Sequence, residues 1–219
     1  MNITVNCNNS IRLEDTQIIY CDPLNIDGRP EDADVILIGH SHYDHFSPED
    51  ILRVACPGTI IVAPESCRAE ILDKLNGAGF FNSPDRDEDF FQFVAPGEAL
   101  EIDDITIETV PAYNIGKNFH KKENDWLGFI ITMNGKRYYI VDDSDNTSEA
   151  NAVACDYLFV PIGGTYTMDV NEAAALTNNI KPSTVIPTHY GSVVGKPEDG
   201  KAFAKLIDNE IKVEFKLFA

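Results

Sequence analysis

Short runs of apolar, β-branched or aromatic residues recur along the chain, and turn-forming residues separate them. Runs of this length and composition are typical of strands in a sheet. The predicted strands are Ile18–Cys21, Val35–Ile38, Ile60–Val62, Ile105–Val110, Leu127–Thr132, Tyr138–Val141, Tyr157–Val160, Thr184–Pro187 and Val213–Phe218. Met133-Asn134-Gly135-Lys136 separates two of these runs, and Asn-Gly readily takes the positive φ angles of a tight turn. We therefore predict a hairpin there.

Other segments carry apolar residues three or four positions apart, the spacing of one face of an α-helix. The predicted helices are Pro48–Ala55, Glu65–Leu75, Asn171–Ile180 and Glu198–Ile207. Ser47 precedes the first helix, and Asp169 is followed three residues later by Glu172, as in a capping box. Because fully apolar strands mix with helices and hairpins, helices should cover the outer faces of the sheets. The elements predict a layered α/β sandwich.

Composition favours one globular domain spanning residues 1–219, because hydrophobic residues make up 43% and charged residues 24% of the chain. The formal net charge of −19 repels phosphate backbones and anionic membranes, so nucleic acid is not an expected partner. The N-terminus lacks a secretory pattern, and no run approaches the roughly 20 apolar residues of a membrane span. We expect a cytoplasmic protein with a small-molecule substrate, and a homo-oligomer is left open.

Three histidines and an aspartate crowd the loop that follows one predicted strand. The run Val35–Ile38 leads through a glycine into His40-Ser41-His42-Tyr43-Asp44-His45, just before the first predicted helix. Imidazole nitrogens and carboxylate oxygens are the ligands that zinc, iron and manganese accept, and a loop lets residues two apart point to one centre. The spacing predicts a metal site.

Asp143 and His189 follow two other predicted strands, Tyr138–Val141 and Thr184–Pro187. Taken alone, Asp143 fits an ordinary turn and His189 fits a half-buried histidine. Layered α/β folds place their sites at strand ends, so both residues join the predicted metal site.

The loop sequence resembles the H-x-H-x-D-H signature of the metallo-β-lactamase superfamily. V-D-D-S-D around Asp143 and I-P-T-H-Y-G around His189 resemble its bridging-aspartate and final-histidine motifs. The likeness runs nearly end to end. It is strongest to the small hydrolases related to ascorbate-6-phosphate lactonases and N-acyl-phosphatidylethanolamine phospholipase D, through segments 110–114 and 161–168. The resemblance implies an α/β fold of the four-layer αββα sandwich type, metallo-β-lactamase-like.

The resemblance also implies a set of ligands for one or two ions, Zn²⁺ or alternatively Mn²⁺ or Fe²⁺. One ion is expected on His40 and His42, and the other on Asp44, His45 and His189. Asp143 is expected to bridge both ions.

Asn114 departs from the family pattern, because the superfamily usually places a third histidine for the first ion at this point. An amide oxygen is a weak donor for a transition metal. Three alternatives follow: Asn114 is a poor ligand, His120 in the next loop replaces it, or a single ion binds. His120 could also contact substrate or nothing.

The expected enzyme is a metal-dependent hydrolase that cleaves an ester, lactone or phosphodiester with a metal-activated water. Lys117, Lys121 and Lys122 surround His120 as the densest basic patch, so a small anionic substrate is expected. The expected catalytic residues are Asp44, His120 and Tyr190, and the neighbouring tyrosines Tyr113 and Tyr166 are further pocket candidates. The alternatives are a phosphodiesterase or nuclease, and a metal-binding or ligand-sensing module that has lost catalysis.

Overall fold

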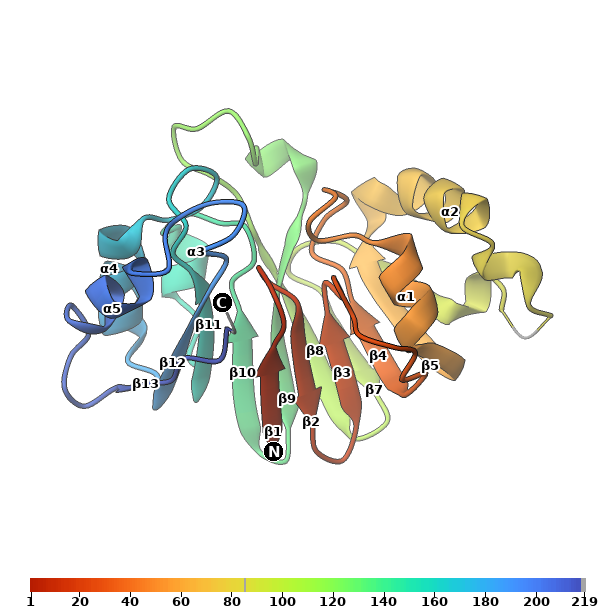
Figure 1. Ribbon diagram of the computed structural model, residues 1–219, viewed down its shortest axis with the longest axis horizontal. Coiled ribbons are helices and arrows are strands. Elements are labelled where there is room, and N and C mark those ends of the chain that lie inside the picture. Colours follow the sequence, from red (N-terminus) through yellow and green to blue (C-terminus); the bar gives the residue numbers. More distant parts are fainter. Residues whose placement is uncertain (85, 218–219) are drawn as a thin grey trace.

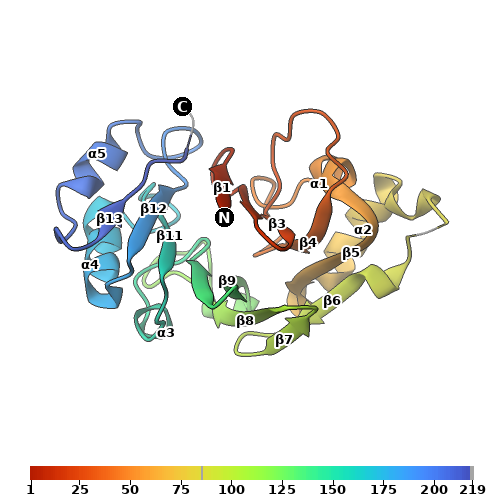
Figure 2. The ribbon, with the colours of Figure 1, turned by 90° about the horizontal axis from the view of Figure 1, so that it is seen from below.

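The computed structural model describes residues 1–84 and 86–217, and it forms two β-sheets packed face to face between layers of helices (Figure 1). Helices α1 (Pro48–Val54) and α2 (Arg68–Gly77) lie outside one sheet. Helices α4 (Val170–Ile180) and α5 (Asp199–Ala204) lie outside the other (Figure 2), and α3 (Ser148–Asn151) is a single turn. This arrangement is the predicted αββα sandwich.

The N-terminal sheet combines an antiparallel edge with a parallel remainder. Within the described residues its strands lie in the order β1 (Asn2–Val5), β2 (Ile11–Glu14), β3 (Ile18–Cys21), β4 (Ala33–Leu37), β5 (Ala55–Pro64) and β6 (Phe91–Val94). The first three strands pair antiparallel, and β3 through β6 pair in parallel. Residues that directly follow β3 and β4 therefore emerge side by side at one edge.

The C-terminal sheet has the same mixed construction. Its spatial order is β13 (Lys212–Val213), β12 (Thr184–Thr188), β11 (Tyr157–Pro161), β10 (Lys136–Ile140), β9 (Leu127–Met133), β8 (Ile105–Pro111) and β7 (Ala99–Ile102). Strands β7 to β10 pair antiparallel, and β10 to β13 pair in parallel. The predicted hairpin is confirmed: Asn134 and Gly135 have φ angles of 52° and 70° between β9 and β10.

Alternation of side chains explains why the central strands are apolar throughout. Val35 and Leu37 of β4 pack in the core between the two sheets, whereas Ile36 packs under α1 and α2. In β10, Tyr138 faces the inner core and Tyr139 joins the cluster beneath α4 and α5. Each central strand thus buries both faces, as sheets covered by helices require.

Two of the predicted helix starts, those with a capping residue, are confirmed, whereas the helix predicted as Glu198–Ile207 is the shorter α5, Asp199–Ala204, without a side-chain cap. The Ser47 side chain accepts a hydrogen bond from the Asp50 amide at 3.3 Å. Asp169 and Glu172 form a reciprocal capping box at the start of α4. The helix predicted from Glu65 begins instead as a 3₁₀ turn, Glu65–Cys67, before α2. Further 3₁₀ turns are Phe80–Asn82, Glu88–Phe90 and Lys122–Asn124.

Several strand predictions need correction. Strands β1, β2, β6 and β7 were not predicted, because they are short and polar residues interrupt their apolar positions. The predicted strand Val213–Phe218 is wrong over most of its length: β13 ends at Val213, and Leu217 forms only an isolated bridge with Val5. Phe218 lies outside the described residues. No helix in the described part of the chain is long and apolar enough to cross a membrane.

Candidate metal centre

The predicted ligands meet at the edge where the parallel strands of both sheets end. His40 lies in the loop after β4, Asp143 follows β10 and His189 follows β12. His120 comes from the long loop between β8 and β9, which rises above the sheets at the top of Figure 1. The side chain of His42 is exposed, and the others at this edge are buried.

His40, His42 and His120 form the first group. The distance from His40 Nε2 to His42 Nδ1 is 3.0 Å, and from His120 Nε2 to the same atom 3.3 Å. On their far sides, His40 Nδ1 lies 3.2 Å from Asp142 Oδ1 and His120 Nδ1 lies 3.0 Å from Asn114 Oδ1. Both of these oxygens accept hydrogen bonds, so each Nδ1 donates and each Nε2 presents a lone pair. Two lone pairs therefore point at His42.

Asp44, His45 and His189 form the second group. His45 Nε2 lies 3.2 Å from His189 Nε2, and His189 Nε2 lies 3.3 Å from Asp44 Oδ2. On the far side of its ring, His45 Nδ1 contacts Asp22 Oδ2 at 2.8 Å. That carboxylate holds the proton on Nδ1, which leaves the Nε2 lone pair facing the group.

Asp143 lies between the two groups. Its Oδ1 is 3.3 Å from both His45 Nε2 and His189 Nε2, and its Oδ2 is 3.4 Å from His120 Nε2. The side chain is buried, and Oδ1 has no hydrogen-bond partner within the described residues. A buried carboxylate oxygen without a donor is costly unless a cation neutralises it. The donor set therefore fits a cation on each side of Asp143.

Electrostatics shifts the pKa values of the two histidine groups in opposite directions. Burial lowers the pKa of His40, His42 and His120, so their imidazoles are neutral near pH 7. Burial alone would raise the pKa of Asp143, but His189 and His45 beside it hold that pKa well below its ordinary value. Burial alone would lower the pKa of His45 and His189, but Asp143 beside them raises the pKa of both. A divalent cation requires neutral imidazoles and an ionised carboxylate, so it must displace any proton that these two histidines carry.

Two supporting carboxylates lie directly behind the ligands and were missed from sequence. Asp22 Oδ1 accepts a hydrogen bond from the Gly39 amide at 2.9 Å, and its Oδ2 holds His45. Asp142 Oδ1 contacts His40 Nδ1 and lies 3.4 Å from His45 Nδ1. Burial, reinforced by Asp142, raises the pKa of Asp22 to about 6. Asp22 directly follows the predicted strand Ile18–Cys21, and that position was a usable signal.

Other supports carried no motif. Asn8 Nδ2 donates to Asp44 Oδ2 at 3.4 Å, and the Trp126 ring stacks on His40 with centroids 4.6 Å apart. Asn8, Asp142 and His189 have φ angles of 42°, 61° and 53°, in the left-handed region. Such strain in residues other than glycine is typical of functional sites.

Asn114 lies behind His120, with its side chain fully occupied. Its Nδ2 donates to the Tyr166 carbonyl at 2.8 Å and to Asp145 Oδ1 at 3.2 Å. Its Oδ1 accepts from His120 Nδ1. The structure thus brings His120 to the cluster and leaves Asn114 to orient it.

The structure does not bring Tyr190, expected from sequence as a catalytic residue, to this cluster. Its ring packs in the apolar cluster beneath α4 and α5, and its hydroxyl lies against Gly200 of α5. Tyr190 is adjacent to His189 in the chain, but only the His189 side chain lies at the cluster.

The lysines around His120 are also placed differently from expectation. Lys117 Nζ lies 2.6 Å from Asp145 Oδ1, and Lys122 Nζ lies 2.6 Å from Glu149 Oε1. Lys121 is exposed. Carboxylates therefore neutralise two of the three cations that were expected to hold an anionic substrate.

A hollow of about 300 Å³ opens over the two groups. Its lining residues are His42, Tyr43, Asp44, Asn118, Phe119, His120, Asp143, Tyr166 and Val193. Reactive groups at the base of a concave surface are the usual arrangement of an active site.

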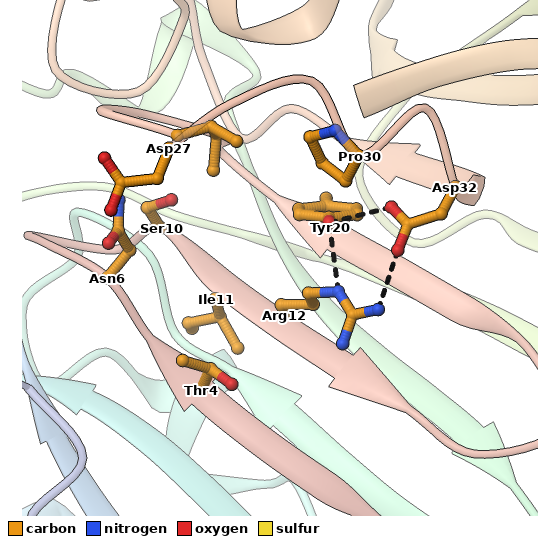
Figure 3. A pocket seen from close by; sticks show the side chains of 10 residues that line it. Thr4, Asn6, Ser10, Ile11, Arg12, Tyr20, Asp27, Pro30 and Asp32 are labelled. Atoms are coloured by element: carbon orange, nitrogen blue, oxygen red, sulfur yellow. Dashed lines mark hydrogen bonds and ion pairs between the residues drawn. The ribbon is translucent and has the colours of Figure 1, made fainter. Parts of the chain in front are cut away.

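A second hollow, of about 310 Å³, lies on the outer face of β1 to β3 (Figure 3). There Arg12 donates to the Tyr20 hydroxyl at 2.9 Å and to Asp32 Oδ2 at 2.8 Å, and Tyr20 donates to Asp32 Oδ1. These groups satisfy one another, so this hollow is not the candidate centre.

Fold and site together define a class: an αββα sandwich with histidines and aspartates clustered at one sheet edge. The beta-lactamase superfamily domain matches residues 3–189, and the chain belongs to this family. It is 28% identical over 216 residues to a UPF0173 metal-dependent hydrolase from Pyrococcus abyssi, covering 92% of this chain and 89% of the relative. A UPF0173 metal-dependent hydrolase from Methanosphaera stadtmanae is 30% identical over 194 residues, with coverages of 82% and 76%.

Solved structures agree. The chain matches the crystal structure of a protein from Parabacteroides distasonis, assigned as a metal-dependent hydrolase, with a TM-score of 0.78 and 28% sequence identity. The match covers 99% of this chain and 93% of the other chain. The metallo hydrolase Igni18 from Ignicoccus hospitalis shares the fold, with a TM-score of 0.71 and 21% sequence identity. The match covers 97% of this chain and 93% of Igni18. Family membership and the buried cluster make the chain a metal-dependent hydrolase of the metallo-β-lactamase superfamily.

Proposed function

We propose that the chain hydrolyses a small ester or lactone at a centre for two divalent cations. His40, His42, His120 and Asp143 Oδ2 would hold one ion, and Asp44, His45, His189 and Asp143 Oδ1 the other. Zn²⁺ fits this mixture of nitrogen and oxygen donors, as do Mn²⁺ and Fe²⁺. The motif likeness to ascorbate-6-phosphate lactonases supports the ester and lactone class.

The single observation that carries this proposal is the position of Asp143. Oδ1 lies 3.3 Å from the imidazole nitrogens of His45 and His189, and Oδ2 lies 3.4 Å from that of His120. Within the described residues, Oδ1 has no hydrogen-bond partner. A carboxylate that supports structure alone would instead be saturated by donors.

The chemistry that such ions supply when bound is a water of lowered pKa and polarisation of the scissile carbonyl oxygen. The chain supplies the remainder. Asp44 borders the hollow, and its Oδ2 is held by Asn8 and His189, so it is placed to orient the attacking water and accept its proton. The side-chain oxygen of Asn114, Oδ1, accepts a hydrogen bond from His120 Nδ1 and so fixes the tautomer of His120.

In the overall reaction, water adds to the acyl carbon and the C–O bond to the alcohol breaks. One hydrogen of the water ends on the alcohol oxygen. The acid ionises and releases its proton to solvent. Asp44 is the chain's carrier for the first proton transfer.

The test is to count metal per chain by elemental analysis in the native protein, His120→Ala and Asn114→Ala. We expect about two ions in the native protein and about one in His120→Ala. Asn114→Ala should still bind about two ions when metal is in excess, but its metal affinity should be roughly tenfold lower, because His120 has lost the residue that orients it. Lys121→Ala, in the same loop with an exposed side chain, is the matched control and should match the native count.

An unchanged count in His120→Ala would remove His120 from the ligand set. Loss of metal without loss of ester hydrolysis would defeat the proposed function itself.

A further inference from the structure

The rim of the hollow over the predicted ligands is apolar. Tyr43, Phe119 and Val193 line it with 73%, 48% and 46% of their surfaces exposed. Ile115, exposed as well, belongs to the same loop as Phe119. Clustered exposed apolar side chains on a soluble surface mark a place where an apolar ligand binds.

The rim is also built as an aromatic wall. The Phe119 ring stands edge-on against the Tyr166 ring, with centroids 4.6 Å apart. The Tyr166 backbone carbonyl in turn lies 3.1 Å from His120 Nδ1. The Phe119–Tyr166 pair therefore contacts the predicted ligand His120 directly, on the side of the hollow where a substrate would approach.

Positive charge of the chain is missing from this surface. Among the described residues the hollow is lined by no lysine or arginine, and its charged members, Asp44 and Asp143, are proposed metal ligands. The nearby cations Lys117 and Lys122 are held by carboxylates, and Lys121 is exposed but does not line the hollow. An anionic substituent within the hollow, outside the metal centre, would therefore meet no cationic partner among the lining residues, in a chain of net charge −19.

We infer that the substrate is a neutral ester or lactone whose hydrocarbon or aryl portion lies against Phe119, Tyr43 and Val193. This inference rests on the proposed hydrolysis. It replaces the anionic substrate that the lysines around His120 indicated.

The experiment compares ethyl valerate with ethyl hemisuccinate, which share a leaving group and differ in acyl charge at similar length. Ethoxide is a poor leaving group, so the hemisuccinate carboxylate does not displace it within the molecule. The metal-loaded full chain should hydrolyse the valerate with a kcat/KM at least about tenfold higher, after subtraction of spontaneous hydrolysis. The EDTA-treated protein gives the metal-independent baseline for both esters.

Two pairs of variants locate the effect. Phe119→Ala should lower kcat/KM for the valerate about tenfold, mainly through KM, and change the hemisuccinate little. Phe215→Ala is the matched control, because Phe215 is 52% exposed and lines a different hollow. Val193→Lys should raise the hemisuccinate-to-valerate ratio about threefold, whereas Val193→Gln should leave the ratio unchanged.

The outcomes separate the two claims. Metal-dependent turnover that is equal for the two esters, or faster for the hemisuccinate, overturns the neutral-substrate inference and leaves the proposed hydrolysis standing. Native kinetics retained in Phe119→Ala overturn it too. Absence of turnover on both esters in protein carrying bound metal overturns the proposed hydrolysis and the inference together.

Discussion

At the scale of single residues, the centre depends on hydrogen bonds that fix which nitrogen of each histidine is free. His45 illustrates this: Asp22 takes its Nδ1 at 2.8 Å, so Nε2 is left for the cluster. Asp22 is itself held by the Gly39 amide and by Asn9 Nδ2 at 3.2 Å. Removal of the carboxylate charge should therefore weaken the metal centre without a large change of shape.

We expect Asp22→Asn to lower metal affinity about tenfold or more, because an amide cannot accept from His45, Gly39 and Asn9 together. Competition with a chromophoric chelator measures the affinity. Asp32→Asn is the control, since Asp32 lies directly before β4 of the same sheet and pairs with Arg12 away from the metal centre. Equal affinities in the two variants would show that Asp22 has only a structural role.

At the scale of elements, the ends of the two sheets approach closely behind the ligands, and Gly39 permits that approach. A Cβ on Gly39 would lie 1.7 Å from Asp142 Oδ2 and 2.9 Å from the Leu127 carbonyl. Asp142 orients His40 through its contact with Nδ1, and Leu127 is the first residue of β9. A shift of either residue would therefore disturb the metal centre.

Gly39→Ala should accordingly destabilise the protein by roughly 2–4 kcal/mol and reduce metal binding. Urea unfolding measures the first effect and elemental analysis the second. Gly77→Ala at the end of α2, where a Cβ meets nothing within 4 Å, should stay within about 1 kcal/mol of the native protein. A Gly39→Ala protein as stable as Gly77→Ala would contradict the steric argument.

The elements also show what sequence could predict. The strands that bury both faces were found because their apolar runs are continuous, and Ile18–Cys21 matches β3 residue for residue. Strands β1 and β2 were missed because polar side chains such as Arg12 alternate with their buried ones. The same limit applies at the site. The loop His40–His45 has a readable spacing, whereas Asn8 reaches Asp44 only through the fold.

At the scale of the whole molecule, the chain concentrates negative charge where burial makes it costly. Asp22, Asp44, Asp142 and Asp143 are all buried at one edge of a protein whose net charge is −19. The inner core contains residues of both sheets, from Val5 to Ile186. This shared core supports the prediction that the chain forms a single domain. Because these carboxylates lie at the junction of the two sheets, the metal should hold the sandwich together.

Metal removal should therefore lower the unfolding temperature of the native chain by about 10 °C, since a ligand present at a thousand times its Kd contributes about 4 kcal/mol. Calorimetry with metal and after EDTA treatment measures the shift. Asp143→Asn removes the proposed bridging charge, so its EDTA-dependent shift should shrink. Because His189 and His45 lower the pKa of Asp143 in the folded protein, the Asp143 charge stabilises the metal-free fold near pH 7, and the metal-free variant should unfold at a lower temperature than the native metal-free protein. A native protein that loses all its metal without any change in unfolding temperature would show that the buried carboxylates at this edge are neutralised by protons or by the histidines beside them, and that the cation serves chemistry alone.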